Sequence, residues 1–94
     1  SIETALRTLQ AHPGECYFWA THTGAELDLL HVRGRRRIGF EIKRSSSPGL
    51  TPSMRIAMKD LHLARLLVVH AGHERYPLAR NVEAVPLGML AGAL

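Results

Sequence analysis

The sequence has one cysteine and no long hydrophobic run, and each shortage excludes a class of protein. A lone cysteine, Cys16, rules out a disulfide framework and a Cys₂His₂ zinc site, so we expect a reducing, cytoplasmic environment. The longest apolar runs, such as Leu66–Val69, are far shorter than the roughly 20 residues that a membrane-spanning helix needs. No cationic start leads into an apolar stretch, so no signal peptide is predicted.

The residues that are present fit one small globular domain. The chain has 94 residues and 46% of them are hydrophobic, so a packed core is expected and wholesale disorder is not. Its 12 lysines and arginines against 8 aspartates and glutamates give a net charge of +4, which is compatible with a phosphate-bearing partner without requiring one. The chain starts at Ser1 and enters a helical pattern at once, so we expect it to be a piece of a longer protein.

Two segments carry helical periodicity. The first is Ile2–Ala11, which ends before a proline and a glycine. The second begins with Thr51 as N-cap and Pro52 at the first helical position and runs to about Leu61. Its inward face is predicted to consist of Met54, Ala57, Met58 and Leu61.

The remaining segments predict an α/β fold of the order α-β-β-β-α-β. Arg65–His70 is a continuous apolar run, so it is expected to be buried on both faces and to lie parallel to the strand before the second helix. The result is a mixed sheet of four or five strands flanked by helices. The predicted strands are Cys16–His22, Glu26–Val32, Arg37–Arg44, Arg65–His70 and, at an edge, Asn81–Val85, after which Pro86 opens a last helical turn or two.

Four charged residues on the predicted hairpin carry the chemical signal. Residues two apart on a strand share a face, so Glu26 lies with Asp28, and Glu41 lies with Lys43. The alternation leaves apolar residues on the opposite faces: Leu27 and Leu29 on one strand, and Ile38, Phe40 and Ile42 on the other. Packing these apolar side chains into one core gathers the four charged residues on the other side of the sheet.

The length of the hairpin loop decides which acids face each other. A two-residue loop, Arg33-Gly34, sets Glu26 opposite Glu41, whereas a four-residue loop, Arg33–Arg36, sets Asp28 opposite Glu41. A three-residue loop without a bulge would break the cluster. Carboxylates about 5 Å apart repel each other unless a cation lies between them, and a divalent metal, Lys43 or an arginine would serve.

Such a cluster suits metal-assisted phosphodiester hydrolysis. Carboxylate oxygens hold Mg²⁺, the metal lowers the pKa of a bound water, and a neighbouring lysine orients that water. A site made only of Asp28, Glu41 and a backbone carbonyl such as that of Ile42 would bind Mg²⁺ or Mn²⁺ weakly, because few charged ligands are present. The competing interpretation is a solvated strand face with a cross-strand ion pair.

The same residues resemble a known superfamily. Asp28-Leu29-Leu30 followed on the next strand by Glu41-Ile42-Lys43, ahead of a helix, resembles the PD-(D/E)xK superfamily with its restriction-endonuclease-like fold. More narrowly, YFWATHTGAELDLL, FEIKRSSSP and LTPSMRIAMKDL resemble the C-terminal domain, itself of unknown function, of a group of bacterial and archaeal AAA-type ATPases. The resemblance covers most of the chain, from about Tyr17 to His70.

This resemblance implies a nuclease-like domain with Asp28, Glu41 and Lys43 as its catalytic residues. Asp28 and Glu41 would be metal ligands, Lys43 would lie at the attacking water, and Glu26 would be an extra acid. The implied partners are nucleic acid and an ATPase domain. No Walker A sequence occurs in these residues, so the ATPase domain is expected upstream in the same protein. The superfamily often has a glutamate on its first helix, for which Glu3 is the sole candidate. The alternative is an inactive nuclease fold kept for recognising DNA or a protein partner.

Two groups of cations are candidate phosphate contacts, with solvated surface as the alternative for both. One is the hairpin tip, with Arg33, Arg35, Arg36 and Arg37, and the other is the helix pair Arg55 and Lys59. His70 and His73 are spaced as metal ligands can be, but no third ligand is near them in the sequence, so transition-metal binding is not expected.

Overall fold

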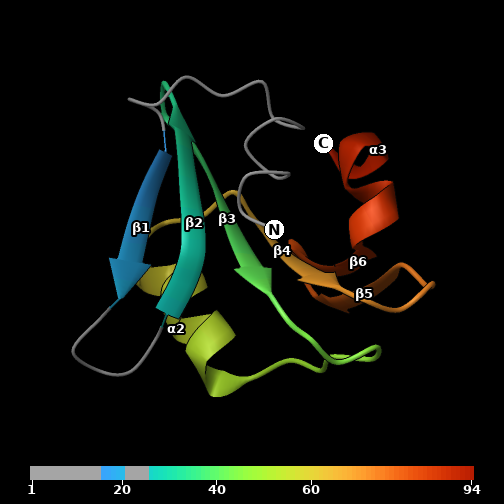
Figure 1. Ribbon diagram of the computed structural model, residues 1–94. Coiled ribbons are helices and arrows are strands. Elements are labelled where there is room, and N and C mark those ends of the chain that lie inside the picture. The colour runs from blue at the N-terminus through green and yellow to red at the C-terminus, as the bar shows by residue number, and fades with distance from the viewer. Residues whose placement is uncertain (1–15, 21–25) are drawn as a thin grey trace.

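A computed structural model describes the backbone of residues 16–20 and 26 and all atoms of residues 27–94. The predicted helix Ile2–Ala11, with Glu3, lies outside the described residues. The described residues form a six-stranded mixed sheet of order β1-β2-β3-β4-β6-β5 (Figure 1). β3 pairs in parallel with β4, and β4 with β6, while the other neighbours are antiparallel. The strands are β1 Cys16–Ala20, β2 Glu26–Arg33, β3 Arg36–Ile42, β4 Arg65–His70, β5 Tyr76–Ala79 and β6 Val82–Pro86.

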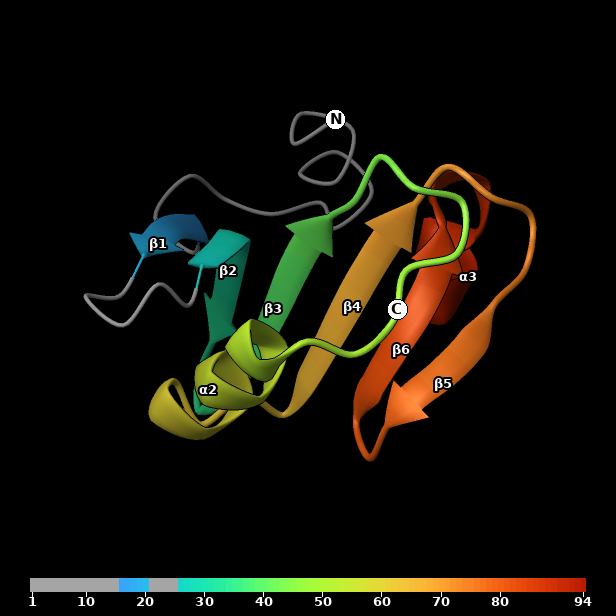
Figure 2. The same cartoon turned by 90° about the horizontal axis from the view of Figure 1, so that it is seen from below.

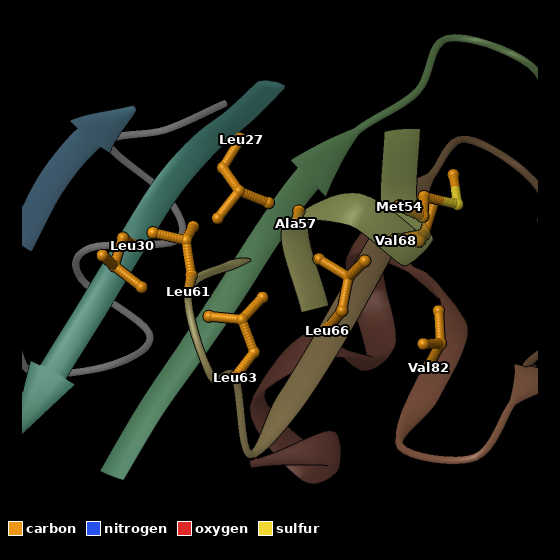
Figure 3. Close-up of a cluster of buried hydrophobic side chains, with 9 residues drawn as sticks. All are labelled: Leu27, Leu30, Met54, Ala57, Leu61, Leu63, Leu66, Val68 and Val82. Atoms are coloured by element: carbon orange, nitrogen blue, oxygen red, sulfur yellow. The ribbon is translucent and has the colours of Figure 1, made fainter. Parts of the chain in front are cut away.

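Helices cover both faces of this sheet (Figure 2). Helix α2, Pro52–Asp60, lies on one face, and the short helices η2, Leu87–Met89, and α3, Leu90–Ala93, lie on the other. A cluster of buried apolar side chains sits under each. The α2-side cluster (Figure 3) consists of Leu27, Leu30, Met54, Ala57, Leu61, Leu63, Leu66, Val68 and Val82. The α3-side cluster consists of Leu29, Ile38, Phe40, Leu67, Val69, Val85, Leu90 and Ala93.

Helix α2 begins and ends where the sequence predicts. The Thr51 hydroxyl accepts the Met54 N–H at 3.3 Å, and Pro52 occupies the first turn, where its missing N–H costs nothing. The helix ends as the backbone turns into the left-handed region at His62, with φ of 51°. Of the predicted inward face, Met54 and Ala57 are fully buried, Leu61 is buried and Met58 is half-buried.

A bulge in β2 corrects the predicted alternation of that strand. Tyr17 pairs with Leu30 but Trp19 pairs with Leu27, so β2 uses one residue more than β1 over the same stretch. A bulge of this kind interrupts the period of two. Leu27 therefore packs in the α2-side cluster with Leu30, whereas Leu29 packs in the α3-side cluster, and the prediction that Leu27 and Leu29 share one face is wrong.

The parallel pairing of β4 with β3 is confirmed, and five of the six β4 residues are buried. The prediction that Asn81–Val85 is an edge strand is wrong, because β6 pairs with β4 on one side and with β5 on the other. The edge is β5, where Pro77 is tolerated because an edge strand leaves some N–H groups unpaired. Pro86 leads into η2 and α3, as predicted.

No helix within the described part of the chain has the length and apolar character needed to cross a membrane.

Candidate functional site

The β2–β3 register decides between the alternatives left open by the sequence. Val32 pairs with Arg37, as in the four-residue-loop alternative, and Arg33 also pairs with Arg36. Gly34 and Arg35 thus form the turn itself, with Gly34 in the left-handed region at φ of 61°. The regular pairing ends at Leu29–Phe40, so Asp28 is the first β2 residue beyond it and lies next to the Glu41–Ile42 end of β3.

Asp28 is fixed against the backbone of β3. Its Oδ2 accepts the Ile42 N–H at 2.6 Å. The next N–H, that of Lys43, donates to the Val69 carbonyl of β4 at 2.8 Å, so the Ile42 N–H points the other way, toward β2. The Asp28 carboxylate thus replaces a backbone carbonyl where the ladder ends, and its Oδ2 lies within about 5 Å of the Glu41 Cα.

Glu41 is a buried carboxylate with only one of its oxygens paired to protein. The residue is 8% exposed. Its Oε1 lies 3.1 Å from Nζ of Lys43, the residue two further along the same strand face. Its Oε2 is buried without a hydrogen-bond partner among the described residues. A buried charged oxygen left without a partner is costly, so this atom marks a place where a non-protein group is expected.

The structure thus brings Asp28, Glu41, Ile42 and Lys43 together at the carboxyl end of β3. The donor atoms there are hard oxygens of the kind that Mg²⁺ and Mn²⁺ take. The Ile42 carbonyl is among them, because the N–H and C=O of one strand residue point to the same neighbour. Within residues 27–94, no three His, Cys, Asp or Glu side chains gather closely enough to hold a metal ion. The Glu26 side chain lies outside the described atoms.

The hairpin arginines lie away from these residues. Arg33, Arg35 and Arg36 are exposed near the turn, five or more residues from Glu41, which is about 17 Å along a strand. Arg37 differs from them, because its Nη1 donates to the Leu61 carbonyl at 3.1 Å and so ties β3 to the end of α2.

Arg55 and Lys59 belong to a basic groove between α2 and the β5–β6 turn. The groove has a volume of about 410 Å³. The third cation of the groove is Arg80, which the sequence analysis did not single out. Asn81, which adopts a positive φ of 62°, is a common turn residue and could have indicated that Arg80 lies at a turn. All three cations are exposed, and the rest of the lining is apolar: Leu50, Met58, Ala79 and Val82.

His70, which the sequence singled out only for its spacing from His73, lies beside the site. It is 2% exposed and follows Leu66 and Val68 on the α2 face of β4. Extending the β3–β4 register by one pair puts it next to Lys43. Its Nδ1 accepts the Gly72 N–H at 3.0 Å, and its ring lies 5.8 Å from that of Tyr76. The period of two along Arg65–His70 could have placed His70 on the same face as Leu66 and Val68.

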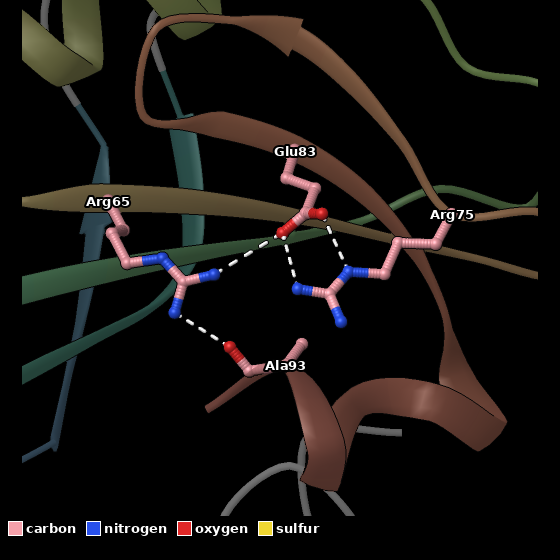
Figure 4. Close-up of polar contacts among 4 residues, drawn as sticks. All are labelled: Arg65, Arg75, Glu83 and Ala93. Atoms are coloured by element: carbon pink, nitrogen blue, oxygen red, sulfur yellow. Dashed lines mark hydrogen bonds and ion pairs between the residues drawn. The ribbon is translucent and has the colours of Figure 1, made fainter.

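A charge cluster on the opposite face of the sheet is structural (Figure 4). Glu83 accepts hydrogen bonds from Arg75 Nε at 2.6 Å and from Arg65 Nη2 at 3.3 Å, while Arg65 Nη1 donates to the Ala93 carbonyl at 2.7 Å. The hydrogen bond from Arg75, and then the charges of Arg75 and Arg65, hold the pKa of Glu83 below its usual range, against the effect of burial. The cluster joins β4, β6 and α3.

Comparison with known proteins places the chain in a family. Residues 2–90 match the family model described as a domain of unknown function, DUF4143. The chain is 50% identical over 74 residues to the uncharacterised proteins Rv2008c of Mycobacterium tuberculosis and Mb2031c of Mycobacterium bovis. The match covers 79% of this chain and 17% of each relative. No solved structure matches significantly. Because the family model spans nearly all of its length, the chain belongs to the DUF4143 family.

Proposed function

We propose that this chain is a nuclease-like, nucleic-acid-linked domain of the PD-(D/E)xK type, with Asp28, Glu41 and Lys43 as its catalytic residues and cleavage of phosphodiester bonds as its reaction. The observation that carries the proposal is the 2.6 Å hydrogen bond that holds the Asp28 carboxylate against the backbone of Glu41-Ile42-Lys43. Two acids and a lysine from neighbouring strands thus meet at one strand end, where the Glu41 Oε2 has no partner among the described residues.

The oxygen atoms at this site are of the kind that bind a divalent cation. Asp28, Glu41 and the Ile42 carbonyl would hold Mg²⁺ or Mn²⁺, which would polarise the phosphodiester and acidify a bound water. Lys43 neutralises part of the charge on Glu41 and would hold a phosphate oxygen once substrate arrives. With only two side-chain ligands, weak cation binding is expected.

Two further elements of the proposal concern the surroundings of this site. Arg55 and Lys59 would contact phosphates, because both are exposed beside the groove between α2 and the β5–β6 turn. The chain covers only 17% of the length of its mycobacterial relatives, which leaves room for the ATPase domain expected upstream.

The test is Mg²⁺- and Mn²⁺-dependent cleavage of single- and double-stranded DNA by the whole protein. The wild type should cleave, and Asp28→Ala and Lys43→Ala should each lose at least about 100-fold in rate, the order seen when a group that stabilises transition-state charge is removed. Asp60→Ala, an exposed acid at the end of α2, is the matched control and should cleave like the wild type. Cleavage that survives both site substitutions would refute the assignment.

The second candidate is a recognition module that retains the fold without turnover. It is favoured by the presence of only two acids at the site within the described residues. In that case the wild type and both variants would be equally inert, while binding of DNA or of a protein partner would persist in all three.

A further inference from the structure

Two buried polar atoms on neighbouring strands have no hydrogen-bond partner among the described residues, and both lie on the α2 face of the sheet. One is Oε2 of Glu41 and the other is Nε2 of His70. Glu41 pairs with Val68 across the parallel β3–β4 ladder, and His70 is two residues beyond Val68 on the same face. Such diagonal neighbours are about 7–8 Å apart at the backbone, within reach of a glutamate and an imidazole.

The two atoms have opposite hydrogen-bonding characters. The Gly72 N–H donates to Nδ1 of His70, which fixes a lone pair on that nitrogen. In the neutral imidazole the proton must then be on Nε2, so Nε2 is a donor. Glu41 Oε2 is an acceptor whose sister oxygen is engaged by Lys43. A buried donor and a buried acceptor thus remain unpaired on diagonal neighbours of the β3–β4 ladder.

The chemistry of Glu41 and His70 indicates which small group could bind between them. A bare cation would suit Glu41 but cannot accept the Nε2–H, and an anion would accept the Nε2–H but be repelled by Glu41. Water both accepts and donates, and it is small enough for a place that neither residue opens to solvent, since they are 8% and 2% exposed.

We propose that one internal water molecule bridges Glu41 and His70, accepting the Nε2–H of His70 and donating to Oε2 of Glu41. His70 is thereby a positioning residue for Glu41. Lys43 holds one carboxylate oxygen and the bridge holds the other, so the carboxylate plane is set before any ligand arrives. The consequence for cation binding rests on the proposed function, but the bridge itself does not.

Thermal unfolding of the purified protein tests the bridge through His70 variants and a double-mutant cycle. If a water links the two residues, His70→Leu removes its donor partner as well as the Nδ1 acceptor of the Gly72 N–H. The melting temperature should then fall by at least about 5 °C, the shift for one buried polar contact in a domain of this size. His70→Gln, which keeps an N–H donor, should recover most of that loss. An unchanged or raised melting temperature in His70→Leu would overturn the proposal, because deleting a truly unpartnered donor is neutral or stabilising.

A double-mutant cycle then asks whether the two residues share the occupant. Glu41→Leu and His70→Leu together should lower the melting temperature by clearly less than the sum of the single effects, and strict additivity would refute the bridge. His73→Leu is the matched control, since His73 is exposed and three residues away, and it should leave the melting temperature unchanged. Should His70→Leu fail to fold, His70→Met takes its place in the cycle.

Mn²⁺ titration followed by electron paramagnetic resonance tests the positioning role. His70→Leu should weaken Mn²⁺ binding about tenfold, as when a partner of a metal ligand is removed, whereas His70→Gln should bind as the wild type does. Equal affinity in all three proteins would overturn the positioning role. A wild type that binds no Mn²⁺ would overturn the proposed function and the positioning role, while the unfolding cycle would still decide the bridge.

Discussion

The Asp28 carboxylate and the Ile42 amide form a 2.6 Å hydrogen bond that takes the place of a ladder bond between β2 and β3. The backbone of β2 bulges against β1 near this point, and the regular β2–β3 pairing stops at Leu29–Phe40. An acid at the bulge therefore does two things: it satisfies a β3 amide that the backbone of β2 leaves unpaired, and it brings a negative charge next to Glu41.

Replacing Asp28 by alanine should destabilise the fold even if the protein has no catalytic activity. The Ile42 amide would lose an ionised acceptor, and a part-buried bond of this kind contributes about 1–2 kcal/mol to the free energy of unfolding. Asp28→Asn keeps an oxygen acceptor and should lose less. Chemical denaturation gives the free energy, and hydrogen exchange should show faster exchange of the Ile42 amide in Asp28→Ala. Unchanged exchange in that variant would contradict the bond.

Adding a methyl group at Gly39 should overpack the α2-side cluster. A Cβ there would lie 2.7 Å from Cδ1 of Leu63 and 3.1 Å from Cδ1 of Leu27. We expect Gly39→Ala to cost about 1–3 kcal/mol of unfolding free energy, because leucines packed on several sides have little room to yield. Gly49→Ala, where nothing lies within 4 Å, is the control and should change stability by far less. Equal effects at the two positions would argue against the packing described for Gly39.

The Glu83 cluster should make stability depend on acid pH. The folded-state pKa of Glu83 is lowered, first by the Arg75 hydrogen bond, so this carboxylate stabilises the fold fully above its unfolded pKa of about 4.3. The contribution should disappear as the pH falls through the lowered folded-state pKa. Unfolding free energies of the wild type and Glu83→Gln, measured from pH 7 to pH 3, should therefore converge toward the acid end. A constant difference between the two proteins across that range would show that ionisation of Glu83 is not involved.

The two basic surfaces should contribute differently to nucleic-acid binding. Arg55→Ala with Lys59→Ala should weaken binding of labelled single-stranded DNA and reduce the slope of log affinity against log salt by about 1.4 for two phosphate contacts. The pair Arg35→Ala with Arg36→Ala, at the hairpin turn, is the comparison of equal charge change. Fluorescence anisotropy across a salt series separates them. If the hairpin pair alone lowers the slope, the groove beside α2 does not carry the DNA.

The sequence by itself determined those features that depend only on residues close together in the chain. Thr51 and Pro52 specify the start of α2 by local means. The Thr51 hydroxyl accepts an N–H of the first turn, and Pro52 has no N–H that would need a partner there. The apolar run Arg65–His70 specifies a buried strand because its apolar residues point to both faces, and a sheet covered on both sides buries them. The pattern Glu41-Ile42-Lys43 puts an acid and a lysine on one strand face for the same local reason, the period of two.

Tertiary structure decided what depends on partners distant in sequence. The β2 bulge follows from pairing with β1 and moved Leu27 to the other face from Leu29, which no property of β2 alone predicts. The interior position of β6 follows from β4 accepting a second parallel neighbour and leaving β5 at the edge. His70 became a diagonal neighbour of Glu41 only once β4 lay in register beside β3. The physical reason is common to all three: strand pairing is a choice among non-local partners, and the side-chain alternation of a single strand does not encode which partner it meets.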